Sequence, residues 1–68
     1  MTIFMQVLTK ADGTFDRSTT IYETMNEAEI AYHTAIASAM NKAAEYKGII
    51  AMLINGQGEV VMRRVWKH

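Results

Sequence analysis

The stretch IIAMLINGQGEVVMRRVW, residues 49–66, decides the fold. Two runs of β-branched and aliphatic residues flank an asparagine and two glycines at 55–58, which is the composition of a β-hairpin turn. The first run, 49–55, is the most apolar in the chain and predicts a central strand. We expect its partner strand over residues 59–66, so this part of the chain is predicted to form a hairpin.

A second hairpin is predicted near the N-terminus. Residues 2–9 are rich in β-branched and aromatic side chains, and the Asp-Gly pair within residues 11–14 takes a turn conformation at little cost. The next strand is expected over residues 17–23. Because that segment is polar and rich in threonine, it suits either the edge of a sheet or a strand with a half-solvated face.

An alanine-rich helix is predicted between the hairpins, over residues 27–46. Asn26 suits its N-cap, and Gly48 is placed to stop it. Its core-facing stripe is expected to consist of Ala28, Ala31, Tyr32, Ala35, Ile36, Ala39 and Ala43, with Tyr46 at its end. The predicted fold class is α+β with ββαββ order: a four-stranded, mainly antiparallel sheet with the helix on one face, in a single domain of residues 1–68.

Composition excludes several classes of site. The chain has 68 residues, no cysteine, two histidines (His33 and His68) and a formal net charge of zero. Disulfides and thiolate metal sites are therefore excluded, a closed zinc site is not expected, and nonspecific DNA coating is disfavoured. The longest apolar run, 49–54, is too short to cross a bilayer. With no signal peptide visible, we expect a cytoplasmic protein without a cofactor.

More apolar surface is present than one helix and one sheet face can bury. The helix is apolar round more than half its circumference, and residues 49–54 alternate aliphatic side chains to both faces. A core this small rarely supplies more than about 3–5 kcal/mol, so self-association as a dimer or higher oligomer is predicted. Leaving some apolar surface exposed is the alternative. The residues expected at the interface are Ile30, Ala37, Met40, Ile50, Met52 and Ile54.

The segment at residues 63–67 is the candidate binding site for a partner. Arg63, Arg64 and Lys67 flank the indole of Trp66, a combination that suits an acidic protein surface or an anionic ligand, either nucleic acid or a nucleotide. The alternative is an edge strand whose cations discourage aggregation and whose Trp66 caps the core.

No catalytic or metal-binding constellation is predicted. Glu29 and His33 stand four residues apart on the helix and are able to hydrogen-bond, but that spacing is frequent by chance. The Gly-x-Gly at 56–58 joins two strands, so it is read as a turn and not as a phosphate loop. The chain is therefore expected not to be an enzyme.

Several short motifs of the helix and the final hairpin look familiar: AYH at 31–33, ASAM at 37–40, MLING at 52–56, VV at 60–61 and Trp66. Together they resemble small uncharacterised proteins encoded by phages and prophages of Gram-positive bacteria. The resemblance implies a host-cytoplasm setting and a role of the kind such proteins have. That role is docking on a host or defence protein as an inhibitor, or sequestering a small signalling ligand.

Overall fold

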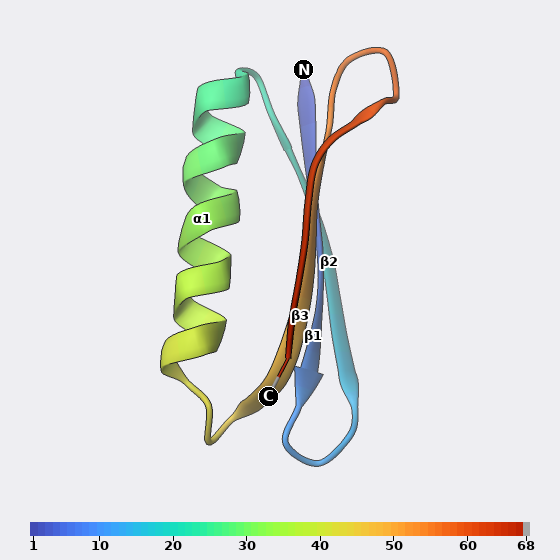
Figure 1. The fold of residues 1–68 in the computed structure, drawn as a ribbon. Coiled ribbons are helices and arrows are strands. Elements are labelled where there is room, and N and C mark those ends of the chain that lie inside the picture. Colours follow the sequence, from blue (N-terminus) through green and yellow to red (C-terminus); the bar gives the residue numbers. More distant parts are fainter. Residues whose placement is uncertain (68) are drawn as a thin grey trace.

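The computed structural model describes residues 1–67 as two hairpins joined by a helix. The sheet has the order β2-β1-β3-β4, all neighbours are antiparallel, and the helix lies on one of its faces (Figure 1). The predicted ββαββ order and the edge position of the second strand are confirmed. The elements are β1 (Thr2–Lys10), β2 (Phe15–Tyr22), α1 (Met25–Asn41), β3 (Tyr46–Ile54) and β4 (Val60–Lys67).

Both predicted turns are present and each uses a glycine with positive φ. Gly13 has φ 90° between β1 and β2, and Gly58 has φ 84° between β3 and β4. The Asn55 side chain accepts hydrogen bonds from the backbone N–H groups of Gln57 (3.0 Å) and Glu59 (2.9 Å). An asparagine that satisfies two turn donors in this way holds the β3–β4 hairpin in register.

The helix begins and ends earlier than predicted. Thr24 is the N-cap, and its hydroxyl accepts a hydrogen bond from the N–H of Glu27 at 3.2 Å. Asn26 lies inside the first turn, so its predicted capping role is wrong. Helix α1 ends at Asn41, and the predicted end at residue 46 is wrong as well, because residues 42–45 form turns.

Gly48 lies inside β3 and does not stop the helix. Strand β3 starts at Tyr46, which pairs with Lys10, and the N–H of Ala11 donates to the carbonyl of Glu45 at 2.8 Å. These backbone bonds extend β3 along the full length of β1. At Gly48 the neighbouring strand is very close, since a Cβ there would lie 2.7 Å from the carbonyl oxygen of Trp66.

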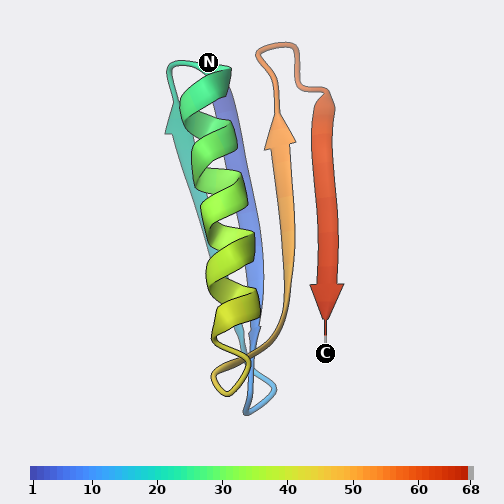
Figure 2. The same ribbon diagram turned by 60° about the vertical axis from the view of Figure 1, so that its left-hand side comes forward.

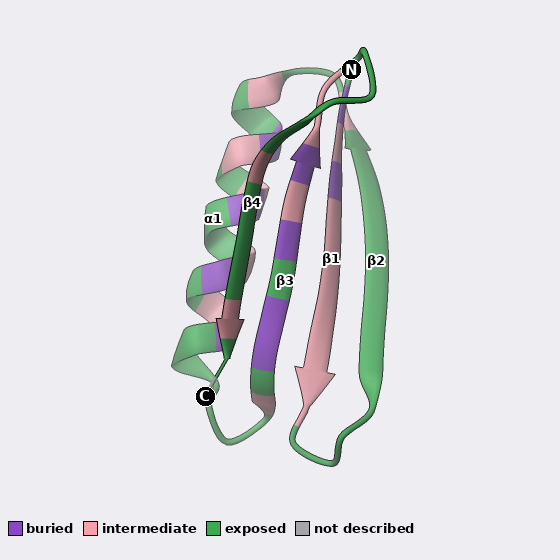
Figure 3. Cartoon of the chain, turned by 45° about the vertical axis from the view of Figure 1, so that its right-hand side comes forward, coloured by how far each residue is buried: buried purple, intermediate pink, exposed green. Residues whose placement is uncertain are grey.

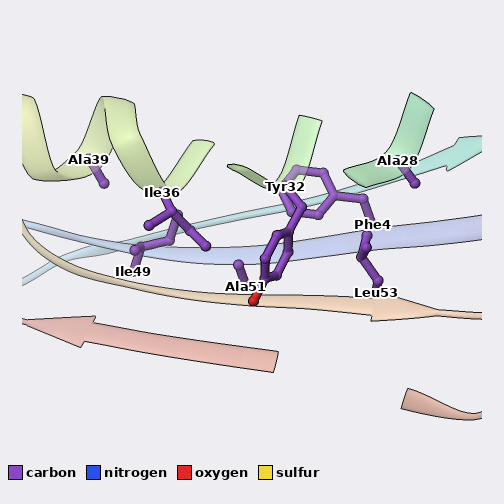
Figure 4. Packing of buried hydrophobic residues seen from close by; sticks show 8 residues of the cluster. All are labelled: Phe4, Ala28, Tyr32, Ile36, Ala39, Ile49, Ala51 and Leu53. Atoms are coloured by element: carbon purple, nitrogen blue, oxygen red, sulfur yellow. The ribbon is translucent and has the colours of Figure 1, made fainter. Parts of the chain in front are cut away.

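The core lies between α1 and one face of the sheet. Three of its eight buried residues are alanines, which allows the helix to approach the strands closely. Four of the helix positions predicted to face the core are buried, and Ala31 and Ala35 pack against them partly buried. The buried set, shown in Figure 4, is Phe4, Ala28, Tyr32, Ile36, Ala39, Ile49, Ala51 and Leu53.

The helix is not centred on all four strands. It packs mainly over β3 and β1, and β4 stands to one side of it (Figure 2). Buried positions are correspondingly concentrated in β3 and at the start of β1, whereas β2 and β4 are mostly exposed (Figure 3). The sheet therefore keeps one covered face, one bare face and two exposed edges.

Candidate protein-binding face

The bare side of the sheet is built from alternate residues of all four strands. Phe4, Ile49, Ala51 and Leu53 point toward the helix, so their chain neighbours point away from it. We call the side that faces away the open face. Taken from β2 across to β4, its four rows are Ile21, Ile3, Ile54 and Val60; Thr19, Met5, Met52 and Arg63; Arg17, Val7, Ile50 and Val65; Phe15, Thr9, Gly48 and Lys67.

The two middle strands make the centre of the open face aliphatic. No other part of residues 1–67 covers it (Figure 1). Ile50 keeps 38% of its surface exposed, and toward the edges Val65 keeps 49% and Ile21 62%. The six side chains at the centre are Ile3, Met5, Val7, Ile50, Met52 and Ile54.

Shallow hollows lie on this face. One of about 320 Å³ lies at the centre, against Met5, Val7, Arg17, Ile50 and Met52, with Gln6, Ser18 and Thr19 completing its wall. A second, of about 270 Å³, lies toward the end of the face that carries Lys67. The walls of both hollows expose more apolar than polar surface, so they accept an aliphatic side chain better than a polar substrate.

The charged side chains of the open face are all cations. Arg17 stands on the β2 edge, and Arg63 and Lys67 stand on the β4 edge. Asp16 projects to the other side, where its carboxylate lies 3.3 Å from the Lys10 ammonium. The remaining acids belong to α1 and to the connecting segments. A chain of zero net charge thus carries a positive rim round an apolar centre.

The four predicted partner-binding residues of β4 are not brought together. Arg63 and Lys67 project from the open face, whereas Arg64 and Trp66 project from the face that carries the helix. Trp66 packs against the core, as the alternative interpretation of this segment expected. His68, which extends the same cationic run, lies outside the described residues.

The predicted self-association residues fall on two separate surfaces. Ile50, Met52 and Ile54 lie at the centre of the open face. The other three are exposed on α1: Ile30, Ala37 and Met40. Because the buried positions of α1 face the sheet, this exposed stripe faces away from the sheet or to its side. The neighbouring open-face residues on β1 and β2 were not among the predicted interface residues: Ile3, Met5, Val7 and Arg17. The alternation in residues 2–9 was the available signal for the first three.

Glu29 and His33 lie one turn apart on α1. Within the described chain these two side chains make no hydrogen bond, and the exposed His33 ring meets the Tyr32 ring edge-on at 5.0 Å. No group of three His, Asp or Glu side chains in residues 1–67 is arranged to hold a metal ion. None of the helices described here has the length and hydrophobicity to span a membrane.

No protein-family model, curated protein or solved structure matches the chain. Function is therefore inferred from the open face itself.

Proposed function

We propose that the chain is a non-enzymatic, self-associating binding protein that docks on another protein and inhibits it. The open face is its main surface for protein–protein contact. One observation carries this proposal: the helix covers one side of the sheet and leaves an aliphatic centre bare on the other. Contiguous apolar patches of this kind normally mark interaction sites in small proteins.

The chemistry of the open face favours a protein over a small substrate. Its centre offers methyl and thioether groups, and the strand backbone beneath them is already hydrogen-bonded within the sheet. A polar substrate needs a few well-placed donors and acceptors to orient it. Methionines at 5 and 52 add flexible side chains that adapt to a partner surface.

The cellular setting belongs to the same proposal. We place the protein in the cytoplasm of a bacterial host, as a phage-encoded inhibitor of a host or defence component. Support for this setting comes from the resemblance of residues 27–66 to small phage and prophage proteins.

A second candidate function is favoured by the charge of the open face. Because Arg17, Arg63 and Lys67 are its charged groups, an anionic ligand such as a nucleic acid or a nucleotide messenger would meet no acid there. The separation of Arg64 and Trp66 onto the other side weakens this candidate. Stacking on the open face would rely on the exposed ring of Phe15.

The test combines mass by light scattering with thermal unfolding, in the presence and absence of nucleic acids and nucleotides. The proposal predicts an oligomer whose mass and unfolding midpoint do not respond to the anionic panel. A rise in the midpoint with a polyanion, lost at high salt, would instead favour the second candidate. A strict monomer with an unchanged midpoint across the panel would contradict both.

A further inference from the structure

We infer that the occupant of the open face is a second copy of this chain. The two copies pack sheet on sheet, and both helices lie on the outside of the sandwich. This inference rests on the proposed function and specifies the first partner of its main contact surface.

The small core favours a partner that is always present. Within residues 1–67, five hydrophobic side chains larger than alanine are buried, and the chain has no cysteine to form a disulfide. A domain below about 70–80 residues usually needs a staple or a partner subunit to be stable. The one partner present wherever the chain is made is another copy of itself.

The dimensions of the open face match a small specific interface. Four strands about 4.8 Å apart, each rising about 3.3 Å per residue over eight residues, give a footprint of roughly 500 Å². Two such faces in contact bury about 1,000 Å² in total, not counting the additional area of the side chains that protrude from each sheet. That area reaches the lower limit for a specific protein–protein interface.

The register of the sheet makes the centre of the face self-complementary. In the aligned class of sheet packing the strands of the two sheets run nearly parallel or antiparallel, and two dyad directions produce such a packing. A dyad along the strands sets Met5 over Met52 and Val7 over Ile50. A dyad across the strands sets Met5 over Val7 and Met52 over Ile50. Either arrangement packs aliphatic side chains on aliphatic side chains at the centre, because the β1 and β3 positions of these two rows are all aliphatic.

Like charges do not prevent this packing. Arg63 shares its row with Thr19, and Arg17 shares the next row with Val65. Under either dyad, each of these arginines meets Thr19 or Val65 of the other copy, and Lys67 also meets an uncharged position. The cations stand at the edges of the face, where their long stems cover apolar surface while their heads stay in water.

The exposed stripe on α1 is the weaker alternative surface. Ile30, Ala37 and Met40 occupy one line along a single helix, and a contact there would leave the open face in water. A contact between this stripe and the open face of another copy is heterologous, so it would build a ring or a filament rather than a twofold dimer.

A pair of matched charge variants tests the inference. Met52→Lys places a cation at the centre of the open face, and Ile30→Lys places the same cation on α1. By light scattering at about 50 µM we expect the parent chain and Ile30→Lys to be dimers of twice 7.7 kDa and Met52→Lys to be at least tenfold weaker in association. A dimer broken by Ile30→Lys and kept by Met52→Lys would overturn the inference but leave the proposed function standing.

Cross-linking covers the case in which Met52→Lys fails to fold. Because the chain has no cysteine, Met52→Cys and Ala37→Cys each introduce one thiol for a short bifunctional maleimide. Met52 lies near the dyad in both arrangements, so we expect most of the Met52→Cys chains to be cross-linked at low micromolar concentration. Ala37→Cys should react without cross-linking. Equal cross-linking of both variants, or cross-linking of Ala37→Cys alone, would overturn the inference.

Discussion

The ring of Phe4 in β1 meets the ring of Tyr32 in α1 edge to face, with centroids 6.4 Å apart and planes at 76°. Both side chains are buried, at 5% and 3% exposure. Figure 4 shows the pair between the helix and the sheet, in a cluster otherwise made of aliphatic side chains. Edge-to-face pairs add about 0.5–1.5 kcal/mol to the energy of burial, so this contact is a principal link between helix and sheet.

Loss of the Tyr32 ring should therefore unfold much of the population. Tyr32→Ala is expected to lower the free energy of unfolding by about 3–5 kcal/mol, and Tyr32→Phe by about 1 kcal/mol or less. Urea titration at a fixed protein concentration, followed by the fluorescence of the one tryptophan, measures both. Equal losses for the two variants would show that the ring pair is not the important contact.

The N-terminal capping of α1 should depend on Thr24 and not on Asn26. The Thr24 hydroxyl accepts from the N–H of Glu27, so Thr24→Ala is expected to cost about 1 kcal/mol of stability. Asn26→Ala, inside the first turn, should change stability by less than about 0.5 kcal/mol. The comparison is made by chemical denaturation of both variants. A larger loss for Asn26→Ala would place the N-cap two residues later.

Strands β3 and β4 approach each other so closely at Gly48 that any side chain there should destabilise the fold. Gly48→Ala puts a methyl group 2.7 Å from the backbone oxygen of Trp66, and we expect a loss of about 1–3 kcal/mol. Gly56→Ala is the matched control, because its nearest atom, the carbonyl oxygen of Met1, lies at 3.6 Å. Thermal unfolding should separate the two variants clearly. Similar midpoints would contradict the tight approach of β4 to β3 at this point.

Acid should weaken the β1–β2 turn through Asp12. Its carboxylate accepts hydrogen bonds from the hydroxyl (2.7 Å) and the N–H (3.0 Å) of Thr14, and these bonds hold the pKa of Asp12 below its usual value of 3.8. Because the folded-state pKa is lowered, the stabilisation is present above the ordinary pKa. The stabilisation is lost as the pH falls through the lowered pKa of the folded state.

The Asp12 prediction is checked by following its carboxyl carbon shift against pH. Thr14→Val removes the hydroxyl donor and keeps the backbone N–H, so the pKa of Asp12 should rise toward its ordinary value. An unchanged titration curve in that variant would mean that the hydroxyl bond is absent in solution.

The hairpins and the core stripe of the helix were predictable because their signals are local. An Asn-Gly or Asp-Gly turn needs only its own residues, and the alternation of residues 49–54 already marks a strand with apolar side chains on both faces. The same alternation in residues 2–9 makes the open face visible in the sequence. The rows of the open face could not be predicted, because each row depends on the register between strands that are distant in the chain.

The helix end was mispredicted because tertiary bonding overrides local preference there. Ala43 and Ala44 favour a helix, but the backbone bond between Ala11 and Glu45 and the pairing of Tyr46 with Lys10 draw this segment into the sheet. The four candidate residues at 63–67 divide between the two faces of the sheet for a simpler reason. Consecutive strand residues point to opposite faces, so Arg63 and Arg64 cannot share a surface.

The central claim is that the open face is covered by a second copy, and the most direct measurement is the thermal midpoint as a function of protein concentration. For a dimer that unfolds to two chains of this length, a hundredfold rise in concentration should raise the midpoint by about 10 °C. Met52→Lys should abolish this dependence, and Ile30→Lys should retain it. A midpoint that stays constant over the hundredfold range in the parent chain would contradict the claim.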